Sequence, residues 1–213
     1  MVSSSWDHTI RVWCLRTGSC VICLDEHTSS VNSLVLLPRH FNLLNLHHEH
    51  MASGSNDNTI KIWNLCTAKC VLTLRGHTSL VKSIILLGNG GNNLNRNTIS
   101  SSSSNSNKSM WYWNRGCELM SSSNDKTIRI WNLNGGARGG GGGQCLKILR
   151  GHERAVNCMS MLLPHLLVSA SSDNTIKVWD LSKGNSDKSN NDASKCVCTL
   201  NEHEDAVKCI IFY

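Results

Sequence analysis

The chain has 213 residues, of which 40% are hydrophobic, 5% aromatic and 17% charged, and its formal net charge at pH 7 is +6. No apolar run approaches the ~20 residues that a membrane-spanning helix needs, and residues 1–5 lack the basic start and apolar stretch of a secretory signal. We therefore expect a soluble intracellular protein, cytoplasmic or nuclear, with no membrane partner.

The first predicted element is a hairpin over residues 3–13, and its sequence pattern recurs three more times. The pattern is Ser-x-Ser-x-Asp-x-Thr-Ile-(Arg/Lys)-(Val/Ile)-Trp, found at residues 3–13, 53–63, 121–131 and 169–179. In the second copy the turn signal Asp57-Asn58 is followed by β-branched and aromatic residues up to Trp63, which favours two antiparallel strands. A unit repeated this strictly buries its apolar face by stacking on its neighbours. The repeat therefore makes an active site the less favoured interpretation.

Two further strand signals follow the hairpin in each unit. In the second unit they cover residues 70–74 and 81–87, on either side of Gly76-His77. Each unit is therefore predicted to contain four short strands. The predicted boundaries are about 1–26, 27–76, 77–151 and 152–202, with 203–213 as a strand of a further unit. The third unit is irregular, because it contains the Asn/Ser-rich residues 88–109 and the Gly-rich residues 135–143, which are typical of loops.

These features resemble the WD-repeat β-propellers over nearly the whole chain. The resemblance rests on the hairpin pattern, on Gly-His at residues 76–77 and 151–152, and on Trp179-Asp180. Other copies of the two dipeptides depart from the family: Trp13-Cys14, Trp63-Asn64 and Trp131-Asn132 replace Trp-Asp, and Glu26-His27 and Glu202-His203 replace Gly-His. The resemblance implies an all-β propeller of four-stranded antiparallel blades, with about four blades forming an incomplete arc of a larger propeller.

The resemblance also implies that one His, Ser, Asp and Trp in each blade form a buried hydrogen-bonded set. Buried Asp, His and indole N–H groups all need partners, which agrees with this role. The four sets are His27, Ser53, Asp57 and Trp63; His77, Ser121, Asp125 and Trp131; His152, Ser169, Asp173 and Trp179; and His203 with Ser3, Asp7 and Trp13. A Ser/His/Asp catalytic triad is less favoured, because nucleophilic catalysis needs one exposed Ser beside one base and not a set in every blade.

The two ends of the chain carry complementary parts of a blade. The first hairpin has no His before it, and His203 has no hairpin after it. Two interpretations stay open: the last strand closes on the first three strands, at the lower limit of propeller size, or the chain is a fragment of a larger propeller.

The third repeat contains a segment that matches the second repeat. Moving the second repeat along the sequence by 50 residues places Trp63 on Trp113, so residues 99–113 are interpreted as a decayed hairpin, with a low-complexity insertion as the alternative.

Eleven Cys residues and one His-rich segment raise the question of a metal site. The Cys residues recur at fixed strand positions, where a thiol serves as a small hydrophobic side chain. The close pairs Cys20-x-x-Cys23 and Cys196-x-Cys198 have no second pair at the spacing of a zinc site. Residues 47–50, His-His-Glu-His, are better explained as a solvated hairpin tip. We predict no metal and no cofactor, and free thiols suit a reducing compartment.

The excess of basic residues does not by itself indicate a nucleic-acid partner. One repeat position holds Arg11, Lys61, Arg129 and Lys177, so part of the charge is spread along the chain. No nucleic-acid-binding motif accompanies it. The charge supports only a non-specific attraction to acidic partners.

Positions that vary between repeats while the scaffold stays constant are the remaining functional signal. In WD-repeat proteins the narrow top face binds peptides through the residue before the hairpin Asp. It also binds them through the residues that flank the first Val of the inner strand, which is the first of the four strands of each blade. Mapped onto this chain, these partner-binding positions are Trp6, Asn56, Asn124 and Ser172; Ser30, Leu80, Ala155 and Ala206; and Asn32, Lys82, Asn157 and Lys208.

We therefore predict a non-enzymatic scaffold or adaptor that binds proteins or peptides and belongs to a larger complex. Trp6, together with Lys82 and Lys208, favours an acidic or phosphorylated peptide that carries an apolar residue. The alternatives from other classes are a nucleic-acid-associated propeller, which a steep salt dependence of binding would reveal, and a propeller-based hydrolase. The hydrolase would need a cluster of ionisable residues facing a funnel.

Overall fold

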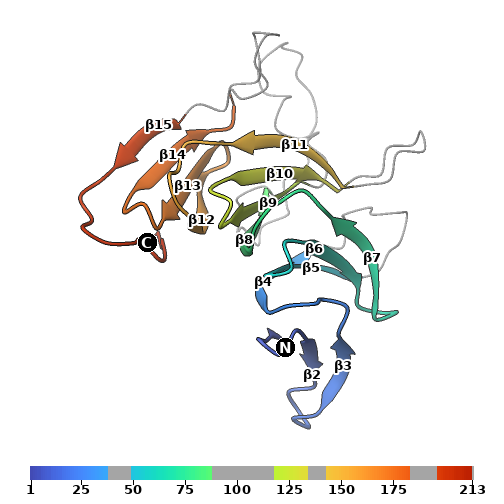
Figure 1. The fold of residues 1–213 in the computed structure, drawn as a ribbon. Coiled ribbons are helices and arrows are strands. Elements are labelled where there is room, and N and C mark those ends of the chain that lie inside the picture. Colours follow the sequence, from blue (N-terminus) through green and yellow to red (C-terminus); the bar gives the residue numbers. More distant parts are fainter. Residues whose placement is uncertain (38–48, 88–117, 134–142, 183–195, 213) are drawn as a thin grey trace, which may run out of the picture.

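The computed structural model describes residues 1–37, 49–87, 118–133, 143–182 and 196–212. Within these ranges all regular structure is β-strand, and fifteen strands form four antiparallel sheets, which we call blades 1 to 4 (Figure 1). The predicted decayed hairpin at 99–113 and the Asn/Ser-rich residues 88–109 lie outside the described residues.

Each blade is a meander in which consecutive strands pair. Blade 1 contains β1 (Val2–Ser4), β2 (Ile10–Trp13) and β3 (Cys20–Leu24). Blade 2 contains β4 (Val31–Leu37), β5 (His50–Ser55), β6 (Ile60–Asn64) and β7 (Lys69–Leu74). Blade 3 contains β8 (Val81–Leu87), β9 (Glu118–Ser123), β10 (Ile128–Asn132) and β11 (Gln144–Leu149). Blade 4 contains β12 (Val156–Leu163), β13 (Leu166–Ser171), β14 (Ile176–Asp180) and β15 (Cys196–Leu200).

The turn of each repeated hairpin places one non-glycine residue in the left-handed region. In blade 2 this residue is Asn58, with φ 67°. Asp57 Oδ1 accepts hydrogen bonds from the backbone N–H of Thr59, at 2.9 Å, and from its hydroxyl, at 2.6 Å, so the Asp and Thr of the motif hold the turn closed. The equivalent residues in blades 1, 3 and 4 have φ between 68° and 72°: His8, Lys126 and Asn174.

The blades follow one another along an arc (Figure 1). The first strands of blades 2 to 4, β4, β8 and β12, lie along its concave side, and β3, β7, β11 and β15 lie along its outer side. Neighbouring blades contact each other through these inner strands. The all-β propeller architecture that the repeats predict is confirmed, and the arc is open.

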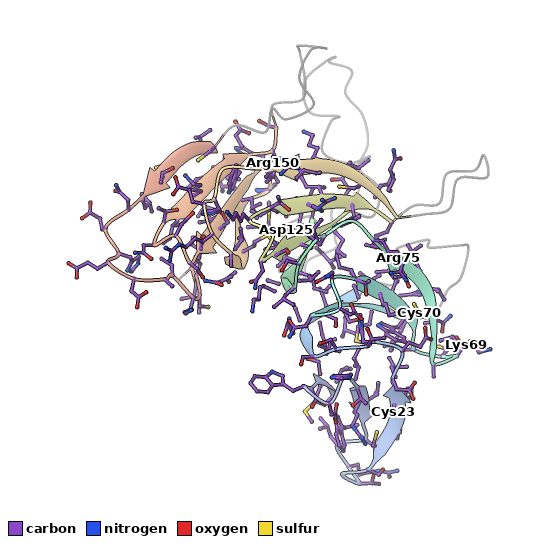
Figure 2. The ribbon with its side chains drawn as sticks, in the orientation of Figure 1. Cys23, Lys69, Cys70, Arg75, Asp125 and Arg150 are labelled. Carbon is purple, nitrogen blue, oxygen red and sulfur yellow. The ribbon has the colours of Figure 1, made fainter. Side chains whose placement is uncertain are left out.

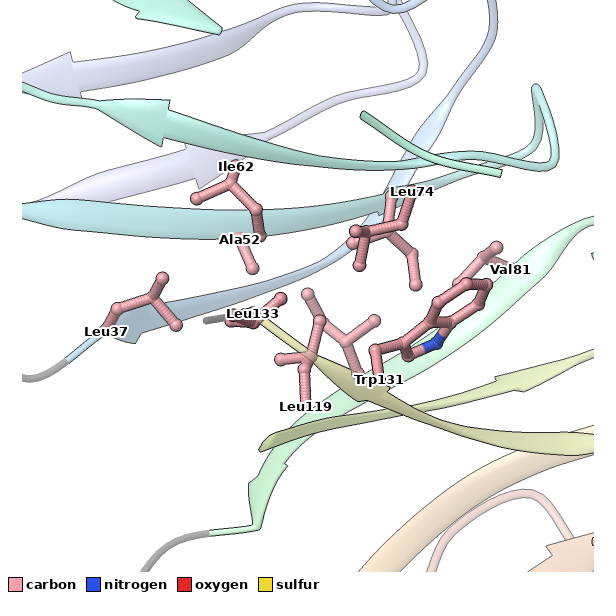
Figure 3. Close-up of a cluster of buried hydrophobic side chains, with 10 residues drawn as sticks. Leu37, Ala52, Ile62, Leu74, Val81, Leu119, Trp131 and Leu133 are labelled. Atoms are coloured by element: carbon pink, nitrogen blue, oxygen red, sulfur yellow. The ribbon is translucent and has the colours of Figure 1, made fainter. Parts of the chain in front are cut away.

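The hydrophobic core is divided into clusters that each lie between two successive blades. Between blades 2 and 3, Trp131 of β10 packs against Ile62 and Leu74 of blade 2, together with Leu119 of its own blade (Figure 3). Trp63 occupies the corresponding place between blades 1 and 2, and Trp179 the place between blades 3 and 4. All three indoles are buried, so the Trp of the motif joins its blade to the preceding one.

The C-terminal residues differ from the sequence expectation. The sequence predicts a strand of a further blade over 203–213, but residues 203–212 form no strand. The segment lies against blade 4: Val207 N–H donates to the carbonyl of Ser171 in β13, at 3.0 Å, and Cys158 of β12 interacts with Cys209 and the Ile210 backbone. Beyond it Ile211 is 87% exposed. A strand needs a partner strand for its backbone groups, and none of the described strands pairs with this segment.

Candidate functional site

A chain of buried hydrogen bonds links four motif residues in blade 2. The indole Nε1–H of Trp63 donates to Ser53 Oγ at 2.7 Å, and Ser53 Oγ lies 2.7 Å from Nε2 of His27. Nδ1 of His27 lies 2.7 Å from Asp57 Oδ2. A carboxylate only accepts, so His27 Nδ1 carries a proton and donates it to Asp57. Nε2 is paired with the Ser53 hydroxyl, so both ring nitrogens of His27 have a hydrogen-bond partner within the set.

Blades 3 and 4 contain the same arrangement. The set in blade 3 is His77, Asp125, Ser121 and Trp131, and the set in blade 4 is His152, Asp173, Ser169 and Trp179. The distance from His Nδ1 to the Asp carboxylate is 2.7 Å in blade 3 and 2.8 Å in blade 4. In both blades His Nε2 lies 2.7 Å from the Ser hydroxyl, and the Trp Nε1–H donates to that hydroxyl at 2.8 Å. Each His comes from the turn that precedes the inner strand, and the other three residues come from the hairpin. The set therefore fastens that turn to the second and third strands of its blade.

The carboxylates of these sets ionise more readily than an ordinary Asp. Burial by itself raises the pKa of the Asp57 carboxyl, but hydrogen bonds from His27 and Thr59 outweigh burial and hold the pKa well below its usual range. The pKa values of Asp125 and Asp173 are lowered in the same way. In blade 4, burial lowers the pKa of His152 in spite of the hydrogen bond to Asp173, which agrees with a neutral imidazole.

The fourth predicted set is not assembled. Trp13 Nε1–H donates to Ser3 Oγ at 2.8 Å, as in the other blades. Asp7 Oδ1 accepts from the Thr9 backbone N–H and hydroxyl. His203, however, is exposed, and the segment after β15 to which it belongs lies at the other end of the open arc from blade 1, so it is not brought to Ser3 and Asp7 (Figure 1).

The Ser-His-Asp geometry of the three assembled sets does not form an accessible nucleophile. Ser53, Ser121 and Ser169 have 0% of their surface exposed. Each of these hydroxyls also accepts the N–H of a buried Trp. A nucleophilic Ser must be reached by a substrate and lie beside an oxyanion site, so these hydroxyls tie strands together instead.

A family model described as WD domain, G-beta repeat matches residues 18–64, 68–132 and 143–180, which is more than two thirds of the chain. This chain belongs to the WD-repeat family. WD-repeat domains generally mediate interactions between proteins and are typically not enzymes. A comparison with curated proteins gave no match.

The described residues of this WD-repeat chain contain neither a membrane-spanning helix nor a cluster of metal-binding side chains. None of the described segments is a helix of the length and apolarity that crossing a membrane requires. In the described ranges, no three His, Cys, Asp or Glu side chains are grouped so that they could hold a metal ion. Residues 47 and 48 of the His-rich segment lie outside those ranges.

The structure brings most of the predicted top-face positions together in pairs. The backbone N–H of the residue before the hairpin Asp donates to the carbonyl of the residue before the inner strand. This bond joins Asn56 to Ser30, Asn124 to Leu80, and Ser172 to Ala155, at 2.8 to 2.9 Å. We call these six residues, together with Asn32, Lys82 and Asn157, the top face. Trp6 and Ala206 occupy the same repeat positions, but they lie at opposite ends of the arc.

Two top-face Asn residues act as ties between blades, which the sequence did not indicate. Asn32 Nδ2 donates to Asn56 Oδ1 in its own blade and to the Val81 carbonyl of blade 3, each at 2.7 Å. Asn157 Nδ2 donates in the same way to Ser172 Oγ at 3.0 Å and to the Val207 carbonyl at 2.8 Å. These side chains are therefore already engaged within the structure. The backbone carbonyls that they bond leave no signal in the sequence.

Blade 3 carries Lys82 where blades 2 and 4 carry these Asn residues. Lys82 makes no side-chain hydrogen bond or ion pair with the described residues. Its neighbour across the top face, Asn124, has a buried Oδ1 with no hydrogen-bond partner in the part of the chain that the structure describes. A buried polar atom without a partner costs free energy, so we expect Lys at this position to make blade 3 less stable than Asn would.

The remaining top-face candidates differ in exposure. Trp6 is 85% exposed, and Lys208 is also exposed. Leu80 and Ala155 are half-buried. The cations Lys82 and Lys208 each follow a residue, Val81 or Val207, whose carbonyl accepts an Asn side chain of the preceding blade. They therefore occupy equivalent places in blade 3 and in the segment that follows blade 4.

Proposed function

We propose that this chain is a protein-interaction scaffold whose top face binds acidic or phosphorylated peptides through Lys82. The observation that carries the proposal is the replacement of a stabilising Asn by Lys at this one position of blades 2 to 4. Asn32 and Asn157 each satisfy two acceptors, whereas Lys82 satisfies none and leaves Asn124 Oδ1 unpaired. Residues that break the local rules of a fold at a cost in stability concentrate at functional sites.

The chemistry of the site sets the kind of peptide. A Lys ammonium donates up to three hydrogen bonds and attracts carboxylate or phosphate groups. Half-buried Leu80 and Ala155, in the turns before β8 and β12, add a small apolar surface to it. An extended peptide with one acidic or phosphorylated residue next to a small apolar residue matches this surface. The adaptor role in a larger complex rests on the same surface.

The variant Lys82→Asn separates binding from folding. The new Asn can make the bonds that Asn32 makes, so we expect a melting temperature equal to or above that of the parent. Binding of a labelled acidic peptide, measured by fluorescence anisotropy, should weaken about tenfold, which corresponds to the ~1.4 kcal/mol of one charge-assisted hydrogen bond. A peptide with the acidic residue replaced by its amide should bind parent and variant equally.

Lys69→Asn is the matched control. Lys69 is exposed and is the first residue of β7, on the outer side of the arc. It lies well away from Asp125, the residue next to Asn124 of the top face (Figure 2). We expect this variant to bind the acidic peptide like the parent. Equal loss in both variants, or no loss in Lys82→Asn, would overturn the proposal. So would a single-stranded nucleic acid that binds better than the peptide, with strong salt dependence and no sensitivity to residue 82.

A further inference from the structure

We propose that the outer side of the arc between blades 2 and 3 contains a second binding site, where Arg129 takes a glutamate carboxylate from a partner protein. Arg129 lies in β10, at a repeat position that is basic in every blade. In blade 2 the cation at this position, Lys61, is paired with the carboxylate of Glu26. In the part of the chain that the structure describes, Arg129 has no such carboxylate. We call Arg129, Arg75 and Gly76 the rim site.

In blades 2 and 4 the basic side chain donates to a hydroxyl of the outer strand. Lys61 Nζ lies 3.3 Å from the hydroxyl of Thr73, the residue opposite it in β7. Lys177 Nζ lies 3.0 Å from the hydroxyl of Thr199, the residue opposite it in β15. In both blades a Thr of the outer strand therefore provides an oxygen acceptor for this cation.

Blade 3 carries a hydrocarbon side chain in place of that acceptor. The residue opposite Arg129 in β11 is Ile148. Arg129 Nη1 lies 3.9 Å from Cys145 Sγ, and its central guanidinium carbon lies 5.9 Å from the centroid of the Trp131 ring. Arg129 Nε is buried and has no hydrogen-bond partner among the described residues. Since a thiol sulfur is only a weak acceptor, the guanidinium keeps donors for which these ranges offer no oxygen.

The glycine before the His of blade 3 leaves the guanidinium open to a partner. In blade 2 this position holds Glu26, whose carboxylate pairs with the cation of that blade. In blade 3 it holds Gly76, which is exposed, and a Cβ built there would lie 2.8 Å from Arg129 Nη1. In blade 4 a Cβ on Gly151 would contact only the Trp of the motif. The guanidinium of blade 3 therefore reaches the surface at a turn that offers it no side chain.

The charge of the third repeat favours an acidic partner. Residues 77–151 contain nine Lys or Arg and two acidic residues, whereas the rest of the chain contains twelve Lys or Arg and thirteen acidic residues. Of the two acidic residues, Asp125 is hydrogen bonded to His77 and Thr127, and Glu118 is buried opposite Asn132 at the other end of the β9–β10 hairpin. The third repeat therefore has no acidic residue to spare for its own Arg129.

The shape of the guanidinium and a neighbouring cation make a carboxylate a suitable ligand. An Arg side chain can donate two parallel N–H bonds to the two oxygens of one carboxylate, which a Lys ammonium does not do. Arg75, the residue before Gly76, is exposed and follows β7 on the outer side of the arc (Figure 2). Its charge adds to the attraction. The carboxylate of Glu26, bound to the same repeat position in blade 2, shows that a glutamate fits this part of a blade.

Nuclear magnetic resonance of the full chain tests the rim site directly. The chain carries Lys82→Asn, so that the proposed top-face binding does not contribute and the two proposals fail separately. The probe is a peptide with a single Glu between Gly residues and with both ends capped. At millimolar concentrations it should shift the Nε–H resonance of Arg129 and the backbone amide resonance of Gly76. The same peptide with Gln in place of Glu should shift neither.

A double variant separates binding from folding. Arg129→Lys with Ile148→Thr rebuilds the Lys–Thr pair of blades 2 and 4, so its melting temperature should equal or exceed that of the parent. Its affinity for the Glu peptide, followed at Gly76, should be about tenfold weaker, the effect of losing one charge-assisted hydrogen bond. The matched control is Arg11→Lys with Cys23→Thr, the same exchange at the corresponding pair of blade 1. The control should bind the peptide like the parent.

Three outcomes would overturn the proposal. The first is a Glu peptide that leaves Arg129 and Gly76 unchanged, or shifts them no more than the Gln peptide does. The second is an equal loss of affinity in the double variant and in its blade 1 control, which would indicate a general effect of charge. The third is inorganic phosphate that shifts Arg129 more strongly than the Glu peptide at the same concentration, which would make phosphate the preferred ligand.

Discussion

The ammonium of Lys61 lies 3.6 Å from the carboxylate of Glu26, and this ion pair joins the turn before blade 2 to the third strand of the blade. In blade 3 the corresponding residues are Arg129 and Gly76, and a Cβ on Gly76 would lie 2.8 Å from Arg129 Nη1. Arg129 instead lies over the Trp131 ring, 5.9 Å from its centroid. The basic side chain at this repeat position is therefore held by an ion pair in blade 2 and by the ring of Trp131 in blade 3.

This difference predicts unequal effects of substitution before the two His residues. Glu26→Gln should lower the free energy of unfolding by less than ~1 kcal/mol, because the Glu26 side chain is about half exposed and its ion pair is screened by solvent. Gly76→Ala should lower it by ~1–3 kcal/mol, because φ is +154° and the methyl group would collide with Arg129 and Trp131. Urea unfolding of both variants measures the difference, and the opposite ranking would contradict it.

The hydroxyl of Ser122 is buried and has no hydrogen-bond partner among the described residues, so removing it should stabilise the protein. Ser122→Ala should raise the free energy of unfolding by about 1 kcal/mol. Its neighbour Ser123 is equally buried, but its hydroxyl donates to the Ser79 carbonyl and accepts from the Asp125 N–H. Ser123→Ala should therefore destabilise by about 1 to 3 kcal/mol. Equal effects of the two variants in a thermal melt would argue against the unpaired hydroxyl.

The turns between the last two strands of blades 1 and 2 offer a matched pair of backbone variants. Gly18 and Ala68 occupy the same turn position, with φ of 68° and 56°. Nothing lies within 4 Å of a Cβ built on Gly18, so Gly18→Ala tests the backbone alone and should cost ~1 kcal/mol. Ala68→Gly should stabilise by up to a similar amount. Midpoints of urea unfolding that shift in the same direction for both variants would be inconsistent with this explanation.

Acid should destabilise the protein in two stages. Burial lowers the pKa of His152 in the folded state, so the stability it contributes is present above ~6.5, its pKa when unfolded, and is lost as the pH falls below that value. The lowered pKa values of Asp57, Asp125 and Asp173 contribute stability above ~3.9 that is lost in stronger acid. Urea midpoints measured at about pH 7.5, 5.5, 4 and 3 should decline throughout. In Asp57→Asn the loss below pH 4 should be smaller.

Thiol reactivity should differ between blades. The Thr17 hydroxyl hydrogen bonds to Cys14 and lowers the pKa of its thiol, whereas burial raises the pKa values of Cys145 and Cys158. The thiolate is the reactive form, so iodoacetamide at pH 7.5 should modify Cys14 before Cys145 and Cys158. Peptide mapping by mass spectrometry measures the order. Thr17→Val should slow the reaction of Cys14 alone, and an unchanged rate would remove Thr17 as the cause.

The sequence predicts the blades well because the signal repeats with a fixed spacing. The residues between Ser53 and Trp63 specify a hairpin by themselves, and the spacing of His27 from that hairpin groups it with Ser53 and Asp57. The inner strand of a further blade was expected at the C-terminus from the same pattern, but a strand forms only when a partner strand is present. Local pattern determines the capacity to form a strand, and pairing determines whether it forms.

The roles of the top-face residues were harder to predict. Asn32 and Lys82 occupy one repeat position and look interchangeable as variable surface residues. What distinguishes Asn32 is its hydrogen bond to the Val81 carbonyl, which belongs to another blade. A backbone carbonyl is present whatever side chain residue 81 carries, so the sequence does not reveal this bond. Glu26 was likewise noted only as a departure from glycine, since its partner Lys61 lies 35 residues away. A hydrogen bond from a side chain to a backbone carbonyl of another blade cannot be recognised from a single sequence, because every residue has that carbonyl.

The exchange of Asn for Lys at residue 82 also affects how the arc bends. Asn32 fastens blade 2 to blade 3, and Asn157 fastens blade 4 to the segment that follows it. Between blades 3 and 4 no such tie exists among the described residues, so this junction depends on the apolar cluster around Trp179. Apolar contacts tolerate small rotations better than directional hydrogen bonds do. We therefore expect the junction between blades 3 and 4, where Lys82 is located, to be more compliant than the junction between blades 2 and 3.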